Sequence, residues 1–177
     1  MNPRRANSRG RVILQPAGGP EAADHYAKTI RSPIRLSSIL RFLDDRDADE
    51  LAARYPTGWT RVWGVTPGVS GVNRGKWLQF AEGDEVLFCG QGKVFASACL
   101  RYRLRNRGLA LNLWGSDKEG ATWEYAYFVG ELRDQKISYG QLAAVLGYAP
   151  DFVVLGVNIL DDDQSAAVLD AFDLTDD

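Results

Sequence analysis

A pair of apolar segments joined by a glycine-rich turn constrains the fold of this chain more than any other feature of its sequence. Residues 84–89 (DEVLFC) and 93–104 (KVFASACLRYRL) are mostly apolar, and only residues 90–92 (GQG) separate them. A turn this short joins antiparallel strands, because parallel strands need a much longer crossover. The sequence therefore predicts an antiparallel hairpin near the middle of the chain.

Further segments extend this hairpin to a sheet of about five strands with short helices between them. Short apolar or alternating runs bounded by Gly, Pro and Asp are typical of strands. A proline that opens a helix, carboxylates ahead of a helix and a glycine after an apolar run mark helix ends. With the hairpin, strands are expected at 60–65, 123–129 and 152–159, and residues 11–15 are a candidate for a further short strand. Helices are expected at 20–30, 44–55, 107–113, 139–146 and 164–172.

The character of the chain changes near residue 59. Residues 1–58 comprise a basic tail and short helices, and residues 59–177 carry most of the expected strands. A length of 177 residues suits one domain with a modest extension. We therefore predict the α+β class: a small, mostly antiparallel β-barrel domain at 59–177 with interleaved short helices, preceded by an N-terminal helical extension at 1–58.

The formal net charge of −2 conceals two halves of opposite sign. Residues 1–107 carry 18 of the 21 Lys and Arg but only 10 of the 23 Asp and Glu, a net charge of +8, whereas residues 108–177 carry −10. Local charge governs local binding. The near-zero total therefore does not exclude a nucleic-acid partner for the basic half.

Several classes of protein are excluded by what the sequence lacks. It has no apolar run of about 18 residues, and no apolar segment follows the basic N-terminus as in a secretory signal. Cys89 and Cys99 fit neither a disulfide framework nor a metal ligand set. We expect a cytoplasmic protein with no membrane partner and no bound metal.

Catalytic motifs are also lacking. His25 is the single histidine, which excludes zinc sites built from several histidines and HExxH metalloproteases within this chain. No GxSxG nucleophile turn and no phosphate-binding GxxxxGK[ST] loop occurs. We interpret His25 as a packing or surface residue, and we predict a protein that is not an enzyme and needs no cofactor.

Two of the five tryptophans lie beside turn-forming residues. Trp63 precedes residues 66–68 (TPG), and Trp114 precedes residues 115–118 (GSDK). Paired indoles on neighbouring loops can sandwich a planar ring, and methylated groups suit such cages. The alternative is that all five tryptophans fill the core, as we expect for Trp77 and Trp123.

Three short motifs resemble a known family. Residues 62–64 (VWG) followed by Thr66-Pro67 resemble the strand-to-loop segment of YTH domains, whose tryptophan forms one wall of a methyl-base cage. Residues 113–118 (LWGSDK) resemble the second cage loop, and residues 83–90 (GDEVLFCG) resemble a strand of EVE domains. Residues 60–172 thus resemble the EVE/YTH-like branch of the PUA superfamily, small barrels that read modified nucleotides, including modules of modification-dependent restriction proteins.

The resemblance implies a role for each matching residue. Trp63 and Trp114 are the cage walls, and polar residues between them read the base edge by hydrogen bonds. Residues of a basic row contact phosphates; its alternative interpretation is a solvated strand face, since period 2 places alternate arginines together. The candidates for the base edge are Thr66, Asn73, Ser116 and Asp117, and those for phosphates are Arg74, Lys76, Arg101, Arg103, Arg105 and Arg107.

The resulting hypothesis is a PUA-like, non-catalytic reader of double-stranded DNA that flips a methylated base into the cage, with 5-methylcytosine as the favoured base. A restriction, defence or epigenetic context follows from the resemblance, with a nuclease partner, a fused nuclease domain or a homodimer as compatible arrangements. The alternative is an RNA-binding PUA-like module that recognises structured or modified RNA. A small-ligand protein or enzyme using the same cavity is a third reading, which no catalytic pair supports.

Overall fold

The predicted hairpin is present as β4 (Glu85–Gly90) and β5 (Lys93–Arg105) in a computed structural model that describes residues 9–174. Gln91 and Gly92 form the turn with φ of 52° and 80°. A two-residue hairpin turn of type I′ requires positive φ at both central residues. The two strands pair antiparallel, so this prediction is confirmed.

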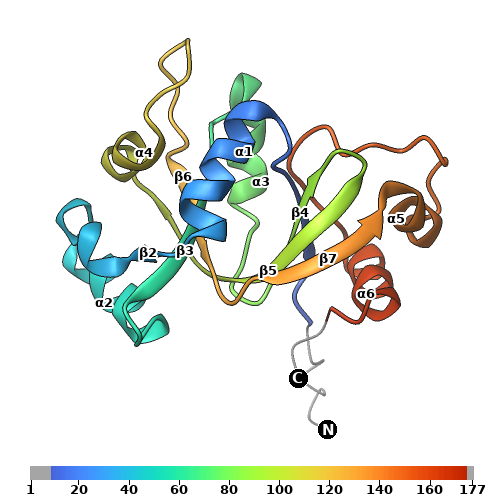
Figure 1. Ribbon diagram of the computed structural model, residues 1–177, viewed down its shortest axis with the longest axis horizontal. Helices are drawn as coiled ribbons and strands as arrows, with labels where there is room; N and C mark the ends of the chain where they lie inside the picture. The colour runs from blue at the N-terminus through green and yellow to red at the C-terminus, as the bar shows by residue number, and fades with distance from the viewer. Residues whose placement is uncertain (1–8, 175–177) are drawn as a thin grey trace, which may run out of the picture.

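The hairpin lies within one eight-stranded sheet (Figure 1). The first part of β5 pairs with β4 and β7, and its last part pairs with β6. The β1–β4 pair is parallel, and the other described pairs are antiparallel. The predicted α+β class with a mostly antiparallel sheet is confirmed. The strand order is β2 (Ile34–Arg35), β3 (Trp59–Val65), β6 (Tyr125–Val129), β5, β4, β1 (Val12–Pro16) and β8 (Asn158–Ile159), with β7 (Arg133–Ser138) on β5.

Short helices cover the sheet, and local signals set their ends. Pro20 opens the first helix, Ser138 caps the fifth in a capping box, and Gly147 ends that helix in the left-handed conformation. In Figure 1 the first helix crosses in front of the sheet, the second and fourth lie at one end, and the fifth and sixth at the other. The helices are α1 (Pro20–Tyr26, continued by a π-helical turn, Ala27–Arg31), α2 (Asp45–Arg54), α3 (Val72–Trp77), α4 (Arg107–Trp114), α5 (Tyr139–Leu146) and α6 (Asp162–Ala171).

Strand alternation separates the interior into clusters on the two faces of the sheet. Trp63 and Val65 of β3 point into the cluster beneath α1, and Val62 points into the cluster beneath α2 and α4. A further cluster lies between the sheet and the pair α5 and α6. Trp77 is buried in the first cluster, where its indole donates to the carbonyl of Ala126 at 3.0 Å, so its expected core role is confirmed.

The structure departs from the sequence prediction in three places. The expected buried strand at 152–159 is wrong: only Asn158–Ile159 pair as β8, and Leu155 is 89% exposed. The strands β2 and β7 were not predicted, because neither has a strong apolar pattern. Residues before 59, which the sequence sets apart as an extension, contribute β1 and β2 to the sheet.

Candidate functional site

A small cavity lies where β3 ends, beside the beginning of α3. It is open to solvent and has a volume of about 200 Å³. The structure brings three predicted base-edge or cage residues together here: Trp63, Thr66 and Asn73. The other lining residues are Gln15, Pro16, Ala22, Gly64, Val65, Trp123, Leu155, Gly156 and Val157.

The turn after β3 positions Thr66 and Asn73. The backbone N–H groups of Asn73 and Arg74 donate to the carbonyl of Pro67 at 3.0 and 3.2 Å, which folds the start of α3 back onto this turn. Gly68 has φ of 75°, and a Cβ there would lie 2.9 Å from Cγ of Asn73. Glycine therefore allows the Asn73 side chain to pack against the turn at the cavity.

Trp63 forms one wall and is 3% exposed. Its ring makes edge contacts with Phe88, at 5.8 Å between centroids, and with Tyr26, at 6.5 Å. Within residues 9–174, the buried indole N–H of Trp63 has no hydrogen-bond partner. Native interiors seldom leave such a donor unused, and the buried indole N–H of Trp114 likewise has no partner among these residues.

Trp123, which the sequence assigns to the core, forms part of the lining, and Trp114 does not. Trp114 is buried behind the wall, where its ring lies at Gly64: a Cβ on Gly64 would lie 2.7 Å from Cζ3 of Trp114 and 2.2 Å from the carbonyl oxygen of Trp123. His25 contacts both indoles, with ring centroids 4.4 Å from Trp123 and 5.9 Å from Trp114. Trp114 thus packs behind the wall of the cavity and is not part of it. The interpretation of His25 as a packing residue is confirmed.

Ser116 and Asp117 also lie away from the cavity lining, in the loop between α4 and β6. One carboxylate oxygen of Asp117 accepts hydrogen bonds from the backbone N–H groups of Glu119, at 2.9 Å, and Ala121, at 2.8 Å. Asp117 therefore organises its own loop, while Ser116 is exposed in it.

The cavity includes one polar residue that sequence reasoning missed. Gln15, at 5% exposure near the end of β1, accepts from the Tyr127 hydroxyl at 2.9 Å and donates to the carbonyl of Pro16 at 3.0 Å. Complete burial raises the pKa of Tyr127 well above its ordinary value, so the hydroxyl stays a donor. The amide of Gln15 is fixed with one N–H and one lone pair still available. The only sequence signal was a glutamine ending an apolar run.

Most of the predicted phosphate-binding side chains have partners within the protein. Arg103 lies over the Trp77 ring at 4.8 Å, and Arg105 and Arg107 share the buried carboxylate of Glu124. Lys76 donates to the carbonyl of Val157 at 2.6 Å. Arg74 is exposed on α3, and its side chain has no hydrogen bond or ion pair with the part of the chain that the structure describes.

Arg101 is separated from this row. The pairing of β5 with β6 shifts between Leu100 and Tyr102, which interrupts the alternation that the sequence predicts for the three arginines. Arg103 and Arg105 lie over Trp77 and Tyr125, whereas Arg101 lines a second cavity of about 480 Å³ at the other end of β3.

Comparison with known proteins gives one informative result. No family model and no curated protein sequence matches the chain. Its structure superposes on the solved structure of the N-terminal domain of Thermococcus gammatolerans McrB bound to m5C DNA, with a TM-score of 0.65 and 13% sequence identity. The chain has the fold of the McrB N-terminal domain.

The superposition covers 93% of this chain and 98% of the McrB domain. Because residues 59–177 are a smaller share of the chain than that, the shared fold includes part of the segment before residue 59. Among residues 9–174 no helix is long and apolar enough to cross a membrane, and no group of three or more His, Cys, Asp or Glu is arranged to hold a metal ion.

Proposed function

We propose that this chain is a non-catalytic reader of modified DNA that holds a flipped, methylated base in the cavity at the end of β3. One observation carries the proposal: two indoles and three polar side chains line a cavity of single-ring size, in the fold of a domain that was solved with m5C DNA. A base inside a duplex reaches such a cavity only after it is flipped out of the stack.

The proposed cage uses Trp63 and Trp123 as its aromatic walls. Stacking on an aromatic side chain is worth about 1–3 kcal/mol per base, and this contributes to offsetting the few kcal/mol that unstacking requires. Val65, Val157 and Leu155 supply apolar surface for a methyl group. Trp114 acts behind the wall through His25 rather than as a wall itself.

The base edge is proposed to be read by Gln15, Asn73 and Thr66. Cytosine presents an amine donor at N4 beside the ring acceptor N3, and an amide that offers both an N–H and a carbonyl oxygen matches such a pair. Gln15 is held in one orientation by Tyr127 and Pro16, so little freedom is lost on binding. These groups make 5-methylcytosine the favoured base.

Phosphate contacts are proposed to come first from Arg74 and Lys76 on α3, because this helix borders the cavity. Where the DNA extends over β5, further phosphate contacts are proposed from Arg103, Arg105 and Arg107. The exposed loop before Trp123 is proposed to add DNA contacts from Ser116 and Asp117. We propose that a nuclease acts on the DNA that this chain binds, and that the nuclease is either a partner protein or a domain fused to this one.

The proposal is tested by fluorescence anisotropy with short duplexes that differ only in one 5-methylcytosine. We expect the methylated duplex to bind at least about tenfold more tightly, which corresponds to about 1.4 kcal/mol. Duplexes with 5-hydroxymethylcytosine or N6-methyladenine, and a matched RNA, complete the panel at one salt concentration. Equal affinity for the methylated and unmodified duplexes would overturn the proposal, and preference for the RNA would replace it with an RNA-binding function.

A further inference from the structure

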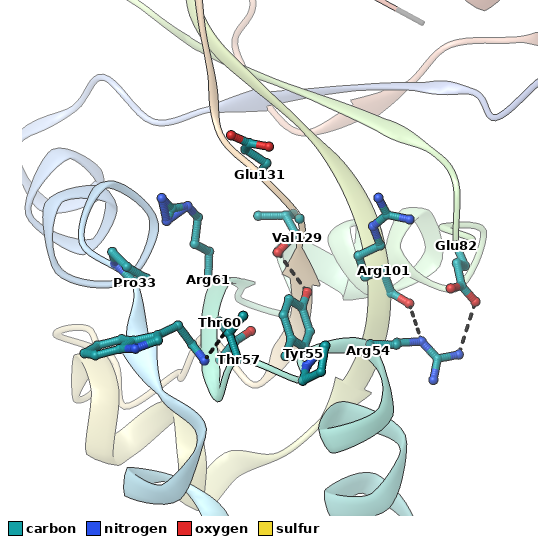
Figure 2. Close-up of a pocket in the computed structure, with 13 residues that line it drawn as sticks. Pro33, Arg54, Tyr55, Thr57, Thr60, Arg61, Glu82, Arg101, Val129 and Glu131 are labelled. Atoms are coloured by element: carbon teal, nitrogen blue, oxygen red, sulfur yellow. Dashed lines mark hydrogen bonds and ion pairs between the residues drawn. The ribbon is translucent and has the colours of Figure 1, made fainter. Parts of the chain in front are cut away.

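A second cavity, of about 480 Å³, lies at the start of β3. Its lining comes from the end of α2 and the loop after it, and from β3, β5 and β6 (Figure 2). Tyr55 forms part of its floor, where the tyrosine hydroxyl donates to the carbonyl of Val129 at 2.8 Å. None of the residues that line this cavity lines the one at Trp63, so the two are separate sites.

The sheet places two arginines on either side of one strand in this cavity. Val129 of β6 pairs with Arg61 of β3 on one side and with Leu100 of β5, next to Arg101, on the other. Neighbouring strands lie about 4.8 Å apart, so the two arginine backbones are about 10 Å apart. Figure 2 shows Arg61 and Arg101 on opposite sides of the cavity with Tyr55 and Val129 between them.

Neither guanidinium is neutralised within residues 9–174. The buried Nε of Arg61 has no hydrogen-bond partner, and the Arg101 side chain lies against the backbone of Gly130 without an ion pair. The neighbouring Arg54 differs, since it pairs with Glu50 and Glu82 and donates to the carbonyl of Arg101. Arg101 is exposed and Arg61 is partly buried, so both guanidinium groups keep N–H donors that an anion in the cavity can accept from.

The charges that remain in the cavity favour an anion. The lining carries three arginines, Arg54, Arg61 and Arg101, against two carboxylates, Glu82 and Glu131, a net charge of +1 (Figure 2). Glu50, which also pairs with Arg54, lies outside the lining. Guanidinium groups bind phosphate oxygens in bidentate geometry. The indole of Trp59 lines the same cavity and is 44% exposed, with the Arg35 guanidinium 4.6 Å from its centroid. An exposed indole beside an anion site suits a base or sugar attached to the phosphate.

We propose that this cleft binds a nucleotide through its phosphate, held between Arg61 and Arg101, with the nucleoside against Trp59. The phosphate belongs either to a free nucleotide or to a nucleic-acid backbone, and both present the same oxygens to the two guanidinium groups. This site does not rest on the methyl-base cavity.

The test is an NMR titration that follows the indole N–H signal of Trp59 and the Nε–H signals of Arg61 and Arg101. The probes are dTMP, the dinucleotide TpT and thymidine, which lacks a phosphate. We expect saturable shifts with dTMP or TpT and none with thymidine. A stronger response to dTMP assigns the site to a free nucleotide, and a stronger response to TpT assigns it to a backbone.

Variants decide whether the two arginines carry the binding. The double variant Arg61→Gln, Arg101→Gln is expected to bind at least about tenfold more weakly, while Arg41→Gln, which removes an exposed charge outside the cleft, leaves the affinity unchanged. Glu131→Gln removes one of the two lining carboxylates and is expected to tighten binding about threefold. Absence of shifts with both phosphate probes, or equal binding by the double variant with an unchanged melting temperature, overturns the proposal. Neither outcome bears on methyl selectivity at Trp63.

Discussion

The imidazole of His25 meets the indole of Trp123 edge-on, with ring centroids 4.4 Å apart and planes at 87°. His25 belongs to α1, and Trp123 precedes β6 as part of the cavity lining. The same imidazole lies 5.9 Å from Trp114. One buried, titratable ring from α1 therefore supports the aromatic wall of the candidate base site from behind.

This contact predicts a pH-dependent loss of stability. Burial lowers the pKa of His25 below its ordinary 6.5, against the opposing effect of the carboxylates of Glu21 and Asp24. The folded state then binds fewer protons than the unfolded state, so stability is complete above pH 6.5 and is lost as the pH falls below it through the folded-state pKa. We expect the melting temperature to fall more between about pH 7.5 and about pH 5.5 in the wild type than in His25→Phe. Since the chain has one histidine, parallel pH profiles for the two proteins would contradict this prediction.

Substitutions of Trp123 and of Trp114 are expected to have different effects on the binding of methylated DNA. Trp123→Ala removes a wall of the proposed cage and should weaken binding of methylated DNA about ten- to hundredfold. It should also lower the melting temperature, because Trp123 packs on His25 and on the cluster beneath α2 and α4. Trp114→Phe should lower the melting temperature while keeping the methyl preference, because Trp114 packs behind Gly64 and His25. Anisotropy titrations and thermal unfolding of both variants test this. The reverse pattern would restore Trp114 as the cage wall.

Local signals account for the parts of the fold that the sequence predicts well. The β4–β5 hairpin follows from its Gln91-Gly92 turn, and α5 follows from its Ser138 cap and from Gly147. Residues 152–157 were wrongly predicted to form a strand, because their apolar side chains lie in several different environments. Phe152 and Val154 pack on the cluster beneath α5 and α6, Val157 enters the cluster beneath α1, and Leu155 is exposed. An apolar run divided in this way resembles a strand in sequence.

In the candidate site, too, only the residues that lie close together in sequence could be predicted from local patterns. Thr66 and Asn73 lie close to Trp63 in sequence, so one turn brings them together. Gln15 and Trp123 reach the cavity only through strand pairing: Trp63 pairs with Tyr127, whose hydroxyl holds Gln15, and Val65 pairs with Tyr125, two residues after Trp123. The choice between Trp114 and Trp123 depends on this register, which no local pattern specifies.

Gly64 should tolerate no side chain. Its Cβ would meet the carbonyl oxygen of Trp123 at 2.2 Å and the Trp114 ring at 2.7 Å, and Gly64 itself has little room to move because it is paired with Ala126 in the sheet. We expect Gly64→Ala to lower the free energy of unfolding by about 3 kcal/mol or more. Gly75→Ala, on α3 with no atom within 4 Å of its Cβ, is the matched control and should stabilise by about 0.5–1 kcal/mol. Equal denaturation midpoints for the two variants would show that the wall is not packed as described.

Arg74 should determine part of the salt dependence of DNA binding. Its side chain is exposed on α3 beside the candidate site and has no internal partner among the described residues, so a phosphate contact costs it no existing interaction. Each phosphate contact contributes about 0.9 to the slope of log K against log salt concentration on B-DNA, so Arg74→Gln should lower the magnitude of that slope by about this amount for methylated and unmodified duplexes alike. Arg103→Gln should instead act mainly on stability, because Arg103 lies over Trp77 and donates to the Trp77 carbonyl at 2.7 Å. Titrations at several salt concentrations measure the slopes, and an unchanged slope in Arg74→Gln would remove α3 from the proposed DNA interface.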